Sequence, residues 1–156
     1  EEVVIGTTKG KAIHFAEEEV RSIGRTGQGV RGIRLGQGDS VVGMEIVKKG
    51  DTVLTATSKG YGKRTPVGKY RLQRRGGRGV INIITDQRNG EVIGIKTVSD
   101  EDDIMLVTSR GLFIRQPVKG IRLIGRSTKG VRLIRLDEGY RLVAVASVVK
   151  ENEDKV

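Results

Sequence analysis

The sequence predicts an all-β fold built from propeller-like blades, on the basis of a repeat, a strand pattern and the lack of a helical pattern. Two sets of glycines recur at spacings of 50 and 51 residues: Gly10, Gly60 and Gly111, then Gly29, Gly79 and Gly130. Each repeat contains short segments rich in Val, Ile and Thr between turns rich in Gly or Asp, as β-strands do. No long window shows the apolar period of about 3.6 residues that an amphipathic helix requires. Four strands in a repeat of this length are typical of propeller blades.

The middle repeat shows the expected order of elements. We predict strands at residues 52–57, 62–67, 80–85 and 91–98, with a tight Ser-Lys-Gly turn between the first two. A longer loop precedes the third strand; it spans residues 68–79, and its counterparts span residues 16–29 and 119–130. Pro66 and Pro117 stand at the mouth of this loop, where a missing N–H does least harm. Helix is limited to one or two turns within residues 16–23.

These elements predict one partial domain over residues 1–156 with three four-stranded blades. The repeats span about residues 1–49, 50–100 and 101–150, and residues 151–156 form an acidic tail. We expect Gly10, Gly60 and Gly111 to serve only turns that need positive φ.

Charge indicates the class of partner. The chain carries 29 Lys and Arg against 19 Asp and Glu, a net charge of +10, which favours polyanions. Only five residues are aromatic, too few for the stacking platforms that hold single strands, so a duplex is favoured. Neither a membrane-spanning run nor a basic amphipathic helix is present, and a cytoplasmic location is expected. Without cysteine and with one histidine, the chain cannot assemble a thiolate or imidazole zinc site, and we expect no metal site.

The basic loop of the middle repeat carries much of this charge. Residues 59–78 contain eight basic residues and no acidic one. Two adjacent glycines, Gly76 and Gly77, would let the backbone approach a partner while neighbouring guanidinium groups reach past it. Arginines recur at the blade period, so in a radial fold they would lie along one rim: Arg25, Arg75 and Arg126. A curved basic rim suits a bent duplex held by its phosphates.

The segment Gln73-Arg74-Arg75-Gly76-Gly77-Arg78-Gly79 resembles the box motif of the C-terminal DNA-wrapping domain of the bacterial gyrase A protein. GQGVRGIRL, TATSKGYGKRT and GRSTKGVRLIRL are similar to blade segments of that family. The resemblance implies a six-bladed β-pinwheel whose blades exchange strands and whose basic edge wraps DNA during negative supercoiling. The partners that it implies are double-stranded DNA, the gyrase B protein, and the remainder of the gyrase A protein, with ATP and Mg²⁺ handled outside this chain.

Two features depart from the family pattern. The chain holds three blades instead of six and resembles the C-terminal half of the domain. The box lies in the middle repeat, whereas the principal box usually belongs to the first blade. Some gyrases carry a second box, and the sequence leaves open which of the two this one resembles. Three blades leave an open edge strand, and the half-domain would remain an open arc or pair head-to-tail with a second copy.

The resemblance and the charge pattern together predict the DNA-contacting residues and their roles. Gln73 would fix the loop or donate to the backbone, and Gly76, Gly77 and Gly79 would permit the shape of the loop. Phosphate contacts and their extension along the rim are predicted for Lys63, Arg64, Lys69, Arg71, Arg74, Arg75, Arg78, Arg25, Arg126 and Lys129.

We expect no catalytic residue. His14 lies in an apparent strand beside apolar neighbours, and the acidic clusters at residues 17–19 and 100–103 are typical of solvated turns. Two alternatives remain open: the matching C-terminal domain of topoisomerase IV, which typically has a degraded box, and a kelch-like propeller that binds proteins. The intact heptad disfavours the first, and the charge and lack of Trp disfavour the second.

Overall fold

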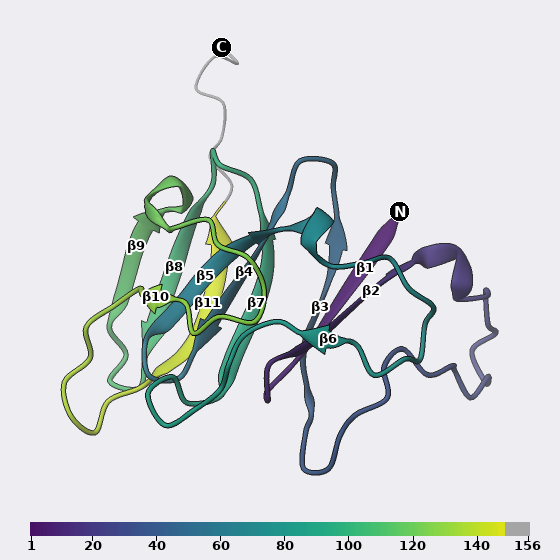
Figure 1. Ribbon diagram of the computed structural model, residues 1–156, viewed down its shortest axis with the longest axis horizontal. Coiled ribbons are helices and arrows are strands. Elements are labelled where there is room, and N and C mark those ends of the chain that lie inside the picture. The colour runs from purple at the N-terminus through teal and green to yellow at the C-terminus, as the bar shows by residue number, and fades with distance from the viewer. Residues whose placement is uncertain (149–156) are drawn as a thin grey trace.

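Three antiparallel sheets make up the computed structural model, which describes residues 1–148 (Figure 1). Each repeat supplies the three long strands of one sheet. In the first repeat these are β1 (Glu2–Thr7), β2 (Lys11–Ala16) and β3 (Val41–Val47). In the second they are β4 (Thr52–Thr57), β5 (Tyr61–Pro66) and β7 (Val92–Val98), and in the third β8 (Asp103–Thr108), β9 (Phe113–Pro117) and β11 (Leu142–Val148). The prediction of an all-β fold with three blades is confirmed.

Two short strands cross from one repeat to the sheet of the preceding repeat. β6 (Val80–Ile81) completes the order β3-β1-β2-β6, and β10 (Val131–Arg132) completes β10-β5-β4-β7. The third sheet has the order β11-β8-β9 and three strands among residues 1–148. Because the outer strand of the first and of the second sheet comes from the following repeat, strand exchange links consecutive blades, as the family resemblance implies.

The third strand of the middle repeat differs from its predicted range of residues 80–85 and from its predicted sheet. The ladder ends after Ile81, because Asn82 and Ile83 both direct their N–H groups to the carbonyl of Gly10. The Asn82 side chain then turns inward, donates to Thr55 Oγ1 over 2.9 Å and accepts from the Tyr70 hydroxyl. Val, Ile and Thr in this segment signal burial in the core as well as strand pairing, and the sequence pattern does not separate the two.

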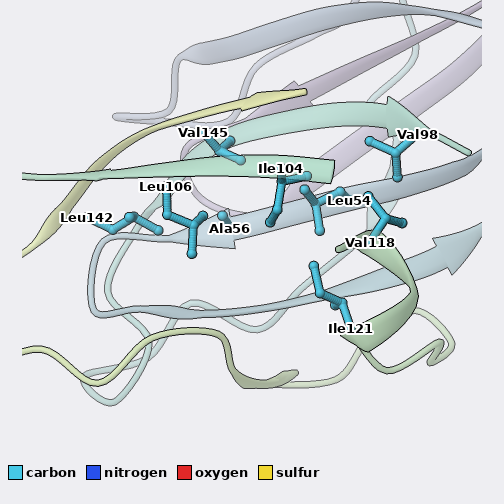
Figure 2. Close-up of a cluster of buried hydrophobic side chains, with 9 residues drawn as sticks. All are labelled: Leu54, Ala56, Val98, Ile104, Leu106, Val118, Ile121, Leu142 and Val145. Carbon is cyan, nitrogen blue, oxygen red and sulfur yellow. The ribbon is translucent and has the colours of Figure 1, made fainter. Parts of the chain in front are cut away.

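Adjacent sheets pack face to face through apolar side chains. The cluster between the second and third repeats comprises Leu54, Ala56, Val98, Ile104, Leu106, Val118, Ile121, Leu142 and Val145 (Figure 2). A second cluster joins the first and second repeats and includes Val4, Val53, Tyr70, Ile83 and Ile95. Both clusters draw residues from two repeats, whereas a third cluster, which includes Val3, Ile13 and Phe15, lies within the first repeat alone.

A single 3₁₀ turn follows the second strand of every repeat. These turns are η1 (Glu17–Glu19), η2 (Val67–Lys69) and η3 (Val118–Gly120). Only η1 lies within residues 16–23, where one or two helical turns were expected. Pro66 and Pro117 end the strands before η2 and η3. Within residues 1–148 no helix has the length and apolar character needed to cross a membrane. The acidic tail at residues 151–156 lies outside the described residues.

The predicted turn glycines have positive φ: 90° at Gly10, 89° at Gly60 and 80° at Gly111. A Cβ on Gly60 would also lie 2.6 Å from the carbonyl oxygen of Ile134 in the third repeat, whereas a Cβ on Gly111 would meet nothing within 4 Å. Gly60 therefore has a packing role between repeats that Gly111 lacks.

We expect Gly60→Ala to cost more stability than Gly111→Ala. Both changes place a side chain at positive φ, which costs about 1–3 kcal/mol, but only the first adds a backbone clash. Urea unfolding of both variants measures the difference. Equal losses would show that the contact between Gly60 and the third repeat contributes nothing.

Candidate nucleic-acid interface

The box, residues 73–79, lies across the outer edge of the first sheet instead of beside its own. After η2 the chain leaves the second sheet, and the Gln73 N–H donates to the carbonyl of His14 in β2 over 2.9 Å. β6 then pairs with the start of β2. The carbonyl of Gly32 accepts from the Gly76 N–H over 2.7 Å, and the Arg34 N–H donates to the carbonyl of Gly77 over 2.8 Å. The first repeat therefore holds the box on both sides.

Arg75 attaches the box to the first repeat. Its Nε donates to the carbonyl of Glu19 and its Nη1 to the carbonyl of Arg31, over 3.2 and 2.7 Å. Its backbone N–H also donates to the Glu19 carboxylate over 3.0 Å.

Arg126 repeats this arrangement one blade later. It donates to the carbonyls of Lys69 and Ile81, the counterparts of the two carbonyls that Arg75 binds, over 2.7 and 2.9 Å. The period of these arginines therefore reflects a contact between repeats, a role that the sequence pattern did not predict. Arg25, the third member, is exposed and makes no side-chain hydrogen bond within residues 1–148.

Lys63 and Arg64 are buried, so the prediction that they contact phosphates is wrong. The Lys63 side chain is fully buried and donates to the carbonyls of Asn82 and Gly125 over 2.6 and 2.7 Å and to Thr128 Oγ1 over 3.1 Å. Burial, with a smaller effect of the nearby Arg126 charge, lowers the pKa of Lys63 to about 8. Counterparts of Lys63 in the other repeats are Ile13 and Ile114, which fits an inward-facing position.

Besides Arg25, four predicted contacts are exposed and have no side-chain hydrogen bond or ion pair in the described part of the chain: Lys69, Arg71, Arg74 and Arg78. Lys129 differs, because its Nζ lies 2.5 Å from the Asp86 carboxylate. Sequence reasoning missed Arg21 and Arg122, which stand where Arg71 stands in the middle repeat and are equally exposed. Their spacing of 50 and 51 residues was the signal that would have found them.

Arg71 and Arg122 occupy equivalent edges of consecutive sheets. Each precedes a leucine that bridges to the second strand of the preceding repeat, Leu72 to His14 and Leu123 to Arg64. The exposed cations of the box thus continue from the edge of the first sheet toward the edge of the second.

The glycines shape the box as expected for Gly76 and Gly79, which have φ of 82° and 75°. A Cβ on Gly79 would lie 2.5 Å from the carbonyl oxygen of Ala12, so this glycine allows the loop to lie against β2. At Gly77 a Cβ would meet only ordinary contacts at 3.5 Å and beyond, so Gly77 has space for a side chain. The Gln73 side-chain oxygen is buried and accepts no hydrogen bond within the described residues.

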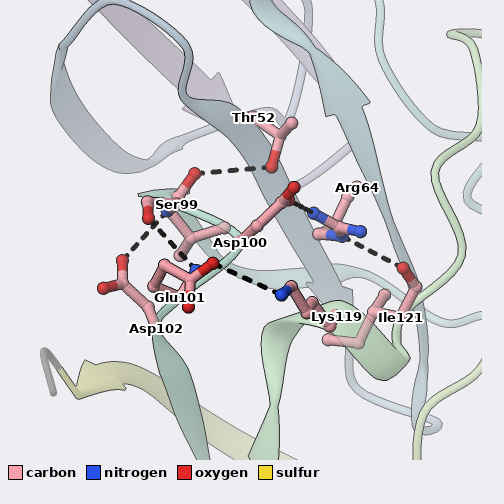
Figure 3. A network of polar contacts seen from close by, with 9 residues as sticks. Thr52, Arg64, Ser99, Asp100, Glu101, Asp102, Lys119 and Ile121 are labelled. Carbon is pink, nitrogen blue, oxygen red and sulfur yellow. Dashed lines mark hydrogen bonds and ion pairs between the residues drawn. The ribbon is translucent and has the colours of Figure 1, made fainter.

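The acidic cluster at residues 100–103 makes internal contacts (Figure 3). Asp100 lies 2.6 Å from Arg64 Nη1, Glu101 3.3 Å from Lys119 Nζ, and Asp102 accepts from the Ser99 N–H over 2.9 Å. Asp103 lies 2.7 Å from Arg115 Nε. Asp100 thus pairs within the second repeat, and Glu101 and Asp103 pair within the third.

His14 has the structural role that the sequence predicts. Its Nδ1 donates to the carbonyl of Tyr70 over 2.9 Å, and its Nε2 lies 2.7 Å from the Glu2 carboxylate. Arg64 makes the corresponding bond to the carbonyl of Ile121, so the same position links the strand to the following loop in two repeats.

Substitutions of the bound and the exposed arginines of the box should differ in their effect on stability. We expect Arg75→Ala to lower the free energy of unfolding by about 1–2 kcal/mol, because its hydrogen bonds to two carbonyls are lost. Arg74→Ala, the matched control, should change it by less than about 0.5 kcal/mol. Urea denaturation of both variants distinguishes the classes; an Arg75 variant as stable as the Arg74 variant would argue against the attachment role.

Lys63 makes stability depend on pH in the alkaline range. Its pKa is lower in the folded chain, about 8, than the ordinary 10.5, so between these values the unfolded state binds more protons. The free energy of unfolding should therefore gain a contribution that rises from pH 8 to pH 10.5. The difference in urea stability between the wild type and Lys63→Met, measured across this range, isolates that contribution. A constant difference would contradict it.

Comparison with known proteins agrees with this geometry. The family model described as the DNA gyrase C-terminal domain, beta-propeller, matches residues 1–48, 51–99 and 102–148. The DNA gyrase A protein of Staphylococcus aureus is 45% identical over 157 aligned residues, which cover 99% of this chain and 18% of that protein. The chain thus spans less than a fifth of this relative.

Two solved structures share the fold closely. A DNA gyrase A C-terminal domain has a TM-score of 0.88 and 31% identity, with 96% of this chain and 51% of that one covered. A topoisomerase IV C-terminal domain has a TM-score of 0.89 and 27% identity, with 95% and 46% covered. The repeats, the strand exchange and the match along nearly the whole sequence show that the chain belongs to the family of DNA gyrase C-terminal β-propeller domains.

Proposed function

We propose that the chain is a non-catalytic module that binds and wraps duplex DNA on its basic edge. The observation that carries this proposal is the set of exposed cations that extend from the box and have no side-chain partner within residues 1–148: Lys69, Arg71, Arg74, Arg78 and Arg122. Cations without internal partners are available to replace the counterions of phosphates, which supplies affinity without sequence preference.

The aromatic residues support a duplex over a single strand. Phe15 and Tyr70 are buried in the cores, and Tyr61 and Tyr140 lie under the guanidinium groups of Arg88 and Arg110 at 4.2 and 4.5 Å. Phe113 is the one exposed aromatic side chain in residues 1–148. A row of bases would therefore find no stacking platform, which single-strand binding requires.

By relation to the DNA gyrase A protein, the wrapped DNA would serve ATP-dependent negative supercoiling by an enzyme in the cytoplasm. The rest of the gyrase A protein and the gyrase B protein would be its partners there, and ATP and Mg²⁺ would act outside this chain. The close fold of the topoisomerase IV domain keeps that enzyme as the second candidate. The intact box, with its exposed arginines on the sheet edge, favours gyrase.

A salt series tests the proposal. If about six phosphates are neutralised, log K for a duplex of about 40 base pairs should fall with log salt at a slope near −5. Arg74→Ala combined with Arg78→Ala should flatten that slope by about 1.8, since each phosphate contact contributes about 0.9. Binding to a single strand of equal length should be weaker.

Lys48→Ala combined with Lys49→Ala is the matched control. These lysines follow β3, next to Glu1 and Glu18, and not beside the box. The control should keep the wild-type slope. A box variant with the wild-type slope would show that the box does not contact phosphates, and wild-type binding without any salt dependence would favour a protein partner.

The open edge of the third sheet is the basis of a further proposal, self-association. Among residues 1–148, no strand pairs with the outer edge of β9. Residues 30–31 are the first-repeat counterparts of β6 and β10, but they pair with no sheet in the described chain. If two copies pair head-to-tail, residues 30–31 of one copy would pair with the free edge of β9 in the other. Light scattering should then show a mass that rises with concentration, and a strict monomer at high concentration would contradict this pairing.

A further inference from the structure

A hollow with a volume of about 480 Å³ opens beside the box, between the β1–β2 turn and residues 33–39. Its volume lies in the range of small-ligand pockets, about 300–1,000 Å³. Four cationic side chains and one acidic residue belong to its lining: Lys9, Lys11, Arg34, Arg78 and Asp39. The charge of the hollow is therefore strongly positive.

The box builds one wall of this hollow. The hydrogen bonds from the Gly76 N–H to the Gly32 carbonyl and from the Arg34 N–H to the Gly77 carbonyl hold residues 32–34 against the loop. Arg34 from the first repeat and Arg78 from the second consequently line the same space. Cations from two repeats meet there because the box crosses to the preceding sheet.

Three of these cations are available to a ligand. Lys11, Arg34 and Arg78 are exposed and make no side-chain hydrogen bond or ion pair in the described chain. Lys9 Nζ donates to the carbonyl of Gln37 over 2.9 Å. Asp39 keeps its negative charge, because its carboxylate accepts from the Thr8 hydroxyl and from the N–H groups of Lys9 and Ser40. It forms no ion pair with the four cations in the described chain, so the lining stays positive.

The corresponding place in the middle repeat has no such free charge. Tyr61 replaces Lys11 there, and the Arg88 guanidinium lies 4.2 Å from its ring centre. Lys129 replaces Arg78 and lies 2.5 Å from Asp86.

The third repeat has an apolar hollow at the same place. It has a volume of about 200 Å³ and Leu112, Ile114 and Leu136 in its lining, together with the charged Arg135 and Asp137. Arg110, the counterpart of Lys9, lies over the ring of Tyr140. Three free cations thus converge in the hollow of the first repeat, whereas Arg135, the counterpart of Arg34, is the one cation in the lining of the third hollow that has no partner within the described residues.

We infer that the hollow of the first repeat binds a phosphate group, with Lys11, Arg34 and Arg78 as its cationic contacts. Guanidinium groups match the oxygens of a phosphate, and several converging cations favour an anion of high charge over a single carboxylate. No aromatic residue belongs to the lining, so a stacked base is not the expected occupant. This inference rests on the proposed function where the phosphate belongs to DNA, and it stands alone where the phosphate is a free ion.

The first arm of the test uses duplex DNA. Lys11→Gln combined with Arg34→Gln should flatten the salt slope of the 156-residue chain by about 1.8. The matched control is Lys48→Gln combined with Arg135→Gln, which removes the same charge and replaces the counterpart of Arg34 in the third repeat. The control should keep the wild-type slope, and Arg34→Lys should keep most of the binding. Thermal melting of each variant checks that folding is unchanged, as expected for exposed side chains.

The second arm uses inorganic pyrophosphate in place of DNA and follows the backbone amide resonances of residues 33–39. Saturable shifts that the Lys11 and Arg34 double variant loses would show that a free phosphate ion occupies the hollow. A slope change without pyrophosphate binding would show that the phosphate comes from the duplex. Both results support the inference.

The inference is overturned if the double variant has the slope of its control and pyrophosphate leaves these amides unshifted. Failure of the proposed function gives a different result, since the wild-type chain would then not bind duplex DNA at all, while the pyrophosphate arm would still report on the hollow.

Discussion

The hydrogen bonds between each basic loop and the sheet of the preceding repeat determine both the fold and the candidate interface. Arg75 and Arg126 bind equivalent pairs of carbonyls one blade earlier. The short strands β6 and β10 complete the sheets to which those loops attach. Because backbone carbonyls near the surface need partners, a guanidinium that serves two of them also fixes the path of the loop. The box is therefore placed by the repeat before it.

Charge along the sequence is consequently a poor guide to which cations face a ligand. Of the basic residues between 59 and 78, Lys63 and Arg64 are in the interior, Arg75 is bound to carbonyls, and Arg71 and Arg74 are exposed. Burial of a lysine is tolerated at Lys63 because three oxygen acceptors surround its ammonium group. The same positive charge thus acts in folding at some positions and is available to phosphates at others.

The sequence predicted the all-β class, the three repeats, the positive φ of Gly60 and its counterparts, and the exposed Arg74 and Arg78, because glycine spacing and strand composition report local geometry directly. It did not predict that the third strand ends after Ile81, that Lys63 points inward, or that Arg75 binds carbonyls. Each of these depends on contacts between residues about one repeat apart, which local composition does not encode. Arg21 and Arg122 are a different case. They were missed, although their spacing of 50 and 51 residues from Arg71 could have identified them from the sequence.

The central claim is that Arg71, Arg74 and Arg78 contact phosphates while Arg75 and Arg126 hold the repeats together. Arginine modification by phenylglyoxal, mapped by mass spectrometry with and without duplex DNA, tests it most directly. We expect Arg71, Arg74 and Arg78 to react in the free chain and to be protected by the duplex, whereas Arg75 and Arg126 should react slowly in both states. Rapid reaction of Arg75 and Arg126 in the free chain, with protection by DNA, would contradict it.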